Sequence, residues 1–254
     1  MKVSLCVLSC AALAAAKVPL YKQCDRRWGS LFMGVKGKIA EDDTICDQGC
    51  AMSSVSMALS GLGLKIDGEQ TTPGSLNAWL QSNSGYTCIG DDCCNLVLAA
   101  PDRLPGSPLK LIGENPKPPA YVLRQELLAD RTVFVAHVRN NSHFVLLTGS
   151  QSDSTFEVND PFYNKTSYEY DDISDVISYS IRRDAISSRF GARGAGEGSA
   201  VGLQGTGGEP NLAVAAAIAA ASGPAPALIS PVVPYPMPLW KQCDPLWAKD
   251  LIET

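Results

Sequence analysis

One of the nine cysteines stands where a thiol could act as a nucleophile. Cys50 follows Gly49 and precedes the segment Ala51–Ser60, whose apolar spacing predicts a buried helix. A thiol attacks a carbonyl as the thiolate, and a helix N-terminus both favours the thiolate and offers backbone N–H groups that can bind an oxyanion. We expect Gly49 to leave room there for a substrate backbone. The alternative is that Cys50 is a small buried helix residue or one half of a disulfide.

The sequence contains only two histidines, so the choice of a base for this thiol is narrow. His143 opens a predicted strand directly after a polar turn, where its ring can reach another element. His137 lies inside the predicted strand Thr132–Val138 and is interpreted as a strand residue with one face exposed. We therefore favour His143 as the base, with a solvated histidine at a strand end as the alternative.

A carboxylate that could orient the imidazole follows the next predicted strand. Asp160 comes directly after Thr155–Asn159, and Pro161 ends that strand because proline cannot extend the ladder. The start of one antiparallel strand and the end of the next lie at the same edge of a sheet, so Asp160 is expected beside His143. Asn159 would point to the other face and is the substitute candidate.

Helical patterns come before strand patterns in the segment that would position these groups. Thr72 followed by Pro73 predicts the N-cap and first residue of a helix, and another helix is expected over 120–128. The predicted strands are Thr132–Val138, His143–Thr148, Thr155–Asn159 and Val176–Arg182. This order indicates an α+β architecture in which N-terminal helices pack on an antiparallel sheet, with the cysteine helix against the sheet that carries the histidine.

Composition and charge exclude some classes of partner. Hydrophobic residues make up 45% of the 254 residues and charged residues 19%, which is ordinary for a globular protein. The net charge of −5 and the pI near 5.1 offer no basic surface for a row of phosphates, so nucleic acid is not an expected partner.

The N-terminus is typical of a secretion signal. Residues 1–16 carry one lysine, an apolar run over 3–13 and three closing alanines, which is the pattern that a signal peptidase cleaves. The alternative is a buried N-terminal helix. The run is too short to span a bilayer, so we expect a secreted or secretory-pathway protein without stable membrane insertion.

The cysteines that remain beside Cys50 after removal of the signal are predicted to form disulfides. No histidine lies near the group at 88–94, and its spacing fits no common zinc pattern, so no metal and no other cofactor is expected. The preferred bonds are Cys24 to Cys46, which would clamp the opening strand beside the cysteine helix, and Cys88 to either Cys93 or Cys94.

A short repeat suggests how the chain is organised. Pro238–Trp247 copies Pro19–Trp28 with seven identities and one Tyr/Trp exchange over ten positions. We expect residues 17–188 to form one domain, 189–236 a linker rich in Gly, Ala and Pro, and 237–254 the start of a second, truncated repeat of the domain. The alternative for the second copy is a tail that docks on the first domain.

Several motifs in one order resemble a known family. They are Val18–Gln23 with Asp25 and Trp28, Thr44–Ile45, Gly49–Met57, Thr72–Pro73 with Leu76, Asn77, Trp79 and Leu80, Gly85–Tyr86, His143–Gly149 and Val158–Pro161. Together they resemble the peptidase domain related to bacteriocin-processing, double-glycine-leader peptidases of the papain-like clan. The resemblance covers nearly all of residues 18–181 and implies a papain-like fold.

The resemblance also implies roles for individual residues. Cys50 would be the nucleophile, His143 the base, Asp160 its orienting partner and Gln23 the side-chain donor of the oxyanion hole. In the family this glutamine lies a short step before the cysteine, whereas 27 positions separate Gln23 from Cys50, so Gln48 is a nearer rival.

The expected activity is that of a secreted cysteine peptidase acting on a peptide or protein through a thioester intermediate. One alternative is a catalytically silent secreted binding module on the same fold. The other is an amidase or transpeptidase that uses the same three residues.

Overall fold

The computed structural model describes residues 18–182 as helices followed by a large antiparallel sheet, which confirms the predicted α+β architecture. The expected signal peptide at 1–16, the linker at 189–236 and the second repeat at 237–254 lie outside the described residues.

The helices begin near the places that the sequence indicates. They are α1 (Ile45–Gln48), α2 (Cys50–Gly61), α3 (Pro73–Ser82) and α4 (Ala120–Leu128), with short 3-10 turns η1 (Ala100–Arg103) and η2 (Tyr170–Asp172). The Thr72 side chain accepts a hydrogen bond from the amide of Ser75, and the Ser75 hydroxyl accepts one from the amide of Thr72. This capping box, with Pro73 in the first turn, explains why α3 begins where it was predicted.

The strands within the described part of the chain form one large sheet and two hairpins. The six-stranded sheet has the order β5 (Leu109–Pro116), β10 (Ile173–Ile181), β6 (Thr132–Val138), β7 (His143–Ser150), β8 (Thr155–Asn159) and β9 (Ser167–Glu169), and every neighbouring pair is antiparallel. The hairpins are β1 (Lys65–Ile66) with β2 (Glu69–Gln70), and β3 (Tyr86–Ile89) with β4 (Asp92–Leu96). The strands at 132–138, 143–150 and 155–159 thus pair as successive neighbours, as the sequence predicts.

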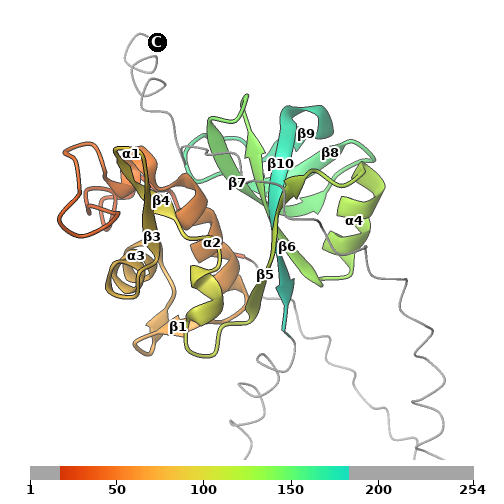
Figure 1. Cartoon of the computed structure of the whole chain (residues 1–254). Helices are drawn as coiled ribbons and strands as arrows, with labels where there is room; N and C mark the ends of the chain where they lie inside the picture. Colours follow the sequence, from red (N-terminus) through yellow and green to blue (C-terminus); the bar gives the residue numbers. More distant parts are fainter. Residues whose placement is uncertain (1–17, 183–254) are drawn as a thin grey trace, which may run out of the picture. The chain divides into compact units, whose positions relative to one another are not determined.

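The sheet is covered on both faces (Figure 1). On one face, Phe144 and Leu146 of β7 pack with α2 in the larger apolar cluster. On the other face, Val145 and Leu147 pack with Leu123 of α4 in a second cluster. Alternate residues of β7 thus enter different clusters, so this strand is packed between the two helical layers.

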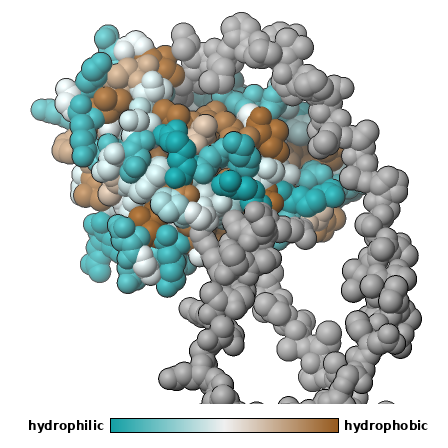
Figure 2. Space-filling model, turned by 60° about the horizontal axis from the view of Figure 1, so that its bottom comes forward, coloured by the Kyte–Doolittle hydropathy of each residue, from teal (hydrophilic) through white to brown (hydrophobic). Residues whose placement is uncertain are grey.

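The outer surface of the described residues is mixed in character. Figure 2 shows hydrophilic and hydrophobic residues interspersed over one face. Large apolar side chains are exposed at several positions, among them Leu20, Leu31, Phe32, Ile112, Tyr121 and Leu128. No helix within residues 18–182 combines the length and apolarity needed to cross a membrane.

Two disulfides confirm the preferred cysteine pairs. Cys24 is bonded to Cys46, which ties the N-terminal segment to α1, and Cys88 is bonded to Cys93 within the β3–β4 hairpin. Cys94 is a free, buried thiol, whose pKa is raised by burial and by the neighbouring Asp92 carboxylate. Two such bonds fit an oxidising compartment.

Candidate functional site

A buried histidine–aspartate pair lies where β7 begins and β8 ends, at one end of these two interior strands of the large sheet. The Nε2 atom of His143 is 2.8 Å from Oδ1 of Asp160, and both side chains are about 1% exposed. The ring of Tyr163 meets the His143 ring edge-on at 5.2 Å. Because an ionised carboxylate only accepts hydrogen bonds, this contact places the imidazole proton on Nε2 and leaves Nδ1 as the basic nitrogen.

The surroundings of Asp160 keep its carboxyl group ionised. Oδ1 also accepts hydrogen bonds from the amides of Phe162 and Tyr163, and Oδ2 accepts one from the hydroxyl of Tyr168 at 3.0 Å. Burial raises the pKa of Asp160, but the bonds from His143 and from the two amides outweigh it, and the pKa lies below its ordinary value. The Tyr168 pKa is raised, chiefly by burial, so its hydroxyl stays a donor.

Because the pKa of Asp160 is lowered in the folded state, the stability of the fold should decrease at low pH. The ionised form of Asp160 stabilises the fold fully above 3.8, the ordinary aspartate value, and this contribution is lost as the pH falls through the lower folded-state pKa. We expect urea unfolding to give a large stability difference between wild type and Asp160→Asn at about pH 6, and a smaller one at about pH 2.5. An equal difference at both pH values would contradict this assignment.

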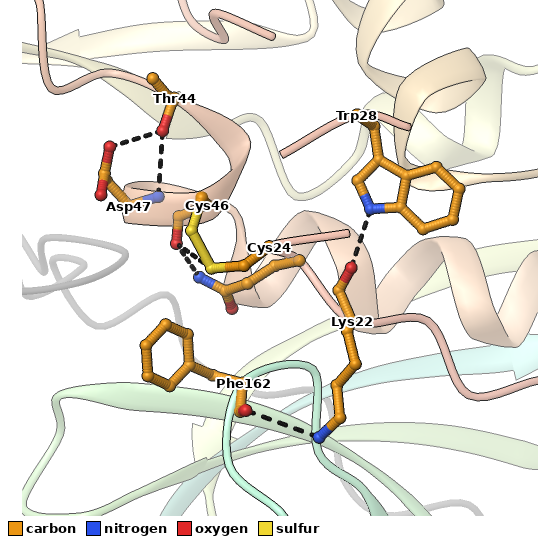
Figure 3. Close-up of a disulfide and its surroundings, with 8 residues drawn as sticks. Lys22, Cys24, Trp28, Thr44, Cys46, Asp47 and Phe162 are labelled. Atoms are coloured by element: carbon orange, nitrogen blue, oxygen red, sulfur yellow. Dashed lines mark hydrogen bonds between the residues drawn. A yellow bond between two sulfur atoms is a disulfide. The ribbon is translucent and has the colours of Figure 1, made fainter. Parts of the chain in front are cut away.

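The loop that carries Asp160 is hydrogen-bonded to Lys22 of the N-terminal segment. The Lys22 ammonium donates hydrogen bonds to the carbonyls of Asp160, Phe162 and Tyr163 at 3.0, 3.5 and 2.6 Å. Figure 3 shows the bond to Phe162. Burial lowers the pKa of Lys22, and the nearby Asp160 charge raises it. The lysine therefore fixes the carbonyls of a loop whose amides face the carboxylate.

Gln23 joins the same loop to the segment before the cysteine. Its amide donates to the carbonyl of Pro161 at 2.8 Å, and its side-chain Nε2 donates to the carbonyl of Cys46 at 2.5 Å. The side chain is fully buried. Gln23 thus lies between the Asp160 loop and α1, which immediately precedes Cys50, although 27 positions separate it from that cysteine in sequence.

Cys50 is the first residue of α2, as predicted, and this helix packs against β7. One turn further on, the Ser54 hydroxyl donates to the carbonyl of Phe144, the residue after His143, at 3.4 Å. The first turn of α2 and the start of β7 are therefore neighbours, since one helical turn advances only about 5.4 Å.

Cys50 is not a thiol in this structure. It is disulfide-bonded, and its side chain is fully buried. The alternative of a disulfide half is thus the state shown here. Any nucleophilic role requires this bond to be reduced.

The structure shows a packing reason for a glycine before Cys50. A Cβ atom on Gly49 would lie 2.4 Å from the Ile45 carbonyl oxygen and 2.8 Å from the Ile45 side chain. This close contact is with α1. Glycine at this position allows α1 to run almost directly into α2.

Replacing Gly49 by alanine should therefore destabilise the fold. We expect a loss of about 2 kcal/mol in the free energy of unfolding, because backbone must shift to admit the methyl group. Urea denaturation measures it, with Gly74→Ala in α3 as the control, where the nearest atom would be 3.3 Å away. Equal stabilities of the two variants would show that the Gly49 contact relaxes without cost.

The alternative candidates for the base, the orienting residue and the oxyanion-hole donor lie in other surroundings. His137 is fully buried rather than exposed on one face, because it stacks on Phe144 at 4.0 Å and its Nδ1 lies 3.3 Å from Asp175. The predicted exposed face of His137 is therefore wrong. Asn159 donates to the carbonyls of Val18 and Pro19, and Gln48 is buried in α1.

The sequence reasoning missed two residues that support the pair. Tyr168 and Lys22 both contact the Asp160 region, yet no sequence motif marks Tyr168, and Lys22 belongs only to the opening motif Val18–Gln23. No local pattern identifies them, because Lys22 reaches its partners from nearly 140 positions away in the chain.

Comparison of the chain with protein-family models, with curated proteins and with solved structures gave no match. Within residues 18–182 no group of three or more His, Cys, Asp or Glu side chains is arranged to hold a metal ion.

Proposed function

We propose that this protein is a secreted, papain-like cysteine peptidase whose nucleophile, Cys50, becomes active when its disulfide is reduced. The observation that carries the proposal is the buried His143–Asp160 pair, fixed by several hydrogen bonds beside the first turn of the helix that Cys50 begins. A buried imidazole with its carboxylate held by additional donors is an arrangement suited to general base catalysis.

The proposed mechanism is acyl transfer. Nδ1 of His143 takes the proton of the reduced Cys50 thiol, and the thiolate attacks the carbonyl of a peptide bond. The oxyanion is stabilised by first-turn amides of α2 and by the side-chain amide of Gln23. One N–H of Gln23 Nε2 donates to the Cys46 carbonyl, and the other N–H would donate to the oxyanion. The imidazolium protonates the leaving amine, and water then hydrolyses the thioester.

A second candidate is favoured by the state of Cys50 itself. A buried, disulfide-bonded cysteine is also what a structural role requires, and the protein would then be a silent binding module with the same fold. In that case the hydrogen bond between His143 and Asp160 would serve only to stabilise the fold where β7 begins and β8 ends.

Hydrolysis under graded reduction separates the two candidates. The full chain is incubated with a fluorogenic peptide library at increasing thiol reductant, as wild type, Cys50→Ala and Cys94→Ala. The peptidase proposal expects hydrolysis that rises with reduction in wild type and in Cys94→Ala and is absent in Cys50→Ala. Mass spectrometry of the acylated protein should locate the thioester on Cys50.

The opposite pattern would support the silent module. It consists of no hydrolysis in any variant at any degree of reduction, together with a lower unfolding free energy of Cys50→Ala. Product analysis on amide-containing cell-wall fragments, run in parallel, tests for amidase activity with the same variants.

A further inference from the structure

A polar hollow opens next to the His143–Asp160 pair. Its volume is about 400 Å³, which falls within the range of small-ligand sites. The lining residues come from the loop between β6 and β7 and from the segment around β9 and η2, and they are Arg139, Asn140, Ser142, Lys165, Tyr168, Asp171, Asp172 and Ser174.

The two cations of the hollow each lie over a tyrosine that touches the pair. The Arg139 guanidinium is 4.1 Å from the ring centre of Tyr163, and this ring meets His143 edge-on. The Lys165 ammonium is 4.4 Å from the ring centre of Tyr168, whose hydroxyl donates to Asp160. The hollow is thus connected to both members of the pair through one aromatic ring each.

Neither cation is neutralised by a carboxylate. Among residues 18–182, Arg139 and Lys165 take part in none of the salt bridges, although Asp171 and Asp172 line the same hollow. Both cations are exposed and so are accessible to an anionic group. A cation over an aromatic ring at an exposed site gains only about 1 kcal/mol, and Arg139 is in addition hydrogen-bonded to Tyr163.

The remaining lining groups indicate the chemistry of the ligand. The aspartates, Asn140 and the hydroxyls of Ser142 and Ser174 are acceptors for N–H donors. A peptide with acidic side chains offers N–H groups to these acceptors and carboxylates to the two cations, whereas inorganic phosphate offers no N–H group. We propose that this hollow binds an acidic peptide segment through Arg139 and Lys165, and that its occupancy alters the His143–Asp160 pair through Tyr163 and Tyr168.

Binding is measured on the unreduced full chain with a fluorescein-labelled tetraglutamate peptide, and tetraserine and inorganic phosphate serve as competitors. Arg139→Gln and Lys165→Gln should each weaken binding about tenfold, because each removes one charge-assisted contact. The matched control is Lys117→Gln, since Lys117 also lies over a tyrosine, at 4.0 Å from the Tyr170 ring, but does not line the hollow. It should bind like wild type.

The link to the pair is read by proton NMR of the histidine rings. The chain has two histidines, so the His143 resonance is identified by its loss in His143→Gln. Saturation with tetraglutamate should shift the His143 resonance in wild type. It should leave this resonance unchanged in the double variant Tyr168→Phe/Arg139→Gln. The coupling to the pair rests on the proposed role of His143. Neither peptide binding nor the NMR shift depends on hydrolysis, so a failure of the peptidase proposal, which the hydrolysis experiment detects, is distinguishable from a failure of this one.

Three results would overturn the inference. Equal affinities of tetraglutamate for wild type and for both cation variants would remove the site, and competition by phosphate as strong as that by the peptide would remove the peptide assignment. Binding that leaves the His143 resonance unchanged would remove the coupling.

Discussion

Alanine in place of His143 is expected to slow the alkylation of reduced Cys50 about 30-fold at pH 5. An unperturbed thiol with a pKa near 8.5 is only about 0.03% thiolate at that pH, whereas a thiol paired with imidazolium, with a pKa near 4, is almost fully ionised. The lower basicity of such a thiolate reduces its nucleophilicity about 100-fold, which leaves a net factor of about 30.

The pH profile of alkylation separates a catalytic pair from a structural one. In wild type the iodoacetamide rate should stay nearly level from about pH 8 to 5, and in His143→Ala it should fall about tenfold for each pH unit. Cys94, whose pKa is raised by burial, provides an internal control that should remain slow in both proteins. Parallel profiles for the two proteins would mean that His143 does not act on the Cys50 thiol.

Loss of the Lys22 ammonium should cost about 3 kcal/mol of folding free energy in Lys22→Met. The ammonium bonds three carbonyls of the Asp160 loop, and methionine keeps the aliphatic length of the side chain but leaves those carbonyls without their donor. The loop also fixes Oδ1 of Asp160 through its amides, so the His143 ring resonance should broaden or shift.

Lys117→Met is the matched control for this substitution. Lys117 donates to the single carbonyl of Tyr170 at 2.6 Å, so its replacement should cost about 1 kcal/mol. Urea unfolding at neutral pH gives both values. A cost for Lys22→Met no larger than that for Lys117→Met would show that the three carbonyls find water or other donors.

Local patterns predicted the elements whose signals lie within a few residues. Thr72 and Pro73 set the start of α3, and the polar turns around Asn140 separate β6 from β7. The pairing of His143 with Asp160, rather than with Asn159, also follows from side-chain alternation between the last residue of β8 and the residue after it. These features depend on backbone geometry that a short segment determines by itself.

Features that depend on distant packing could not be predicted in this way. Strand β5 contains Gly113 and ends in Pro116, which are poor strand signals, and it is stabilised by β10, a late segment of the domain. His137 is buried because its ring stacks on Phe144 of the neighbouring strand, which packs with α2 in the larger apolar cluster. The contact of Gly49 with Ile45 likewise depends on how closely α1 approaches α2.

The position of β10 in the sheet sets the order in which the domain can be completed during synthesis. This strand, the last within residues 18–182, lies between β5 and β6, so a nascent chain that has reached only β9 exposes the facing edges of both. Such bare edges pair readily with other chains. Until residues 173–181 leave the ribosome and insert, we expect the nascent chain to depend on chaperones or on the exit tunnel to avoid aggregation.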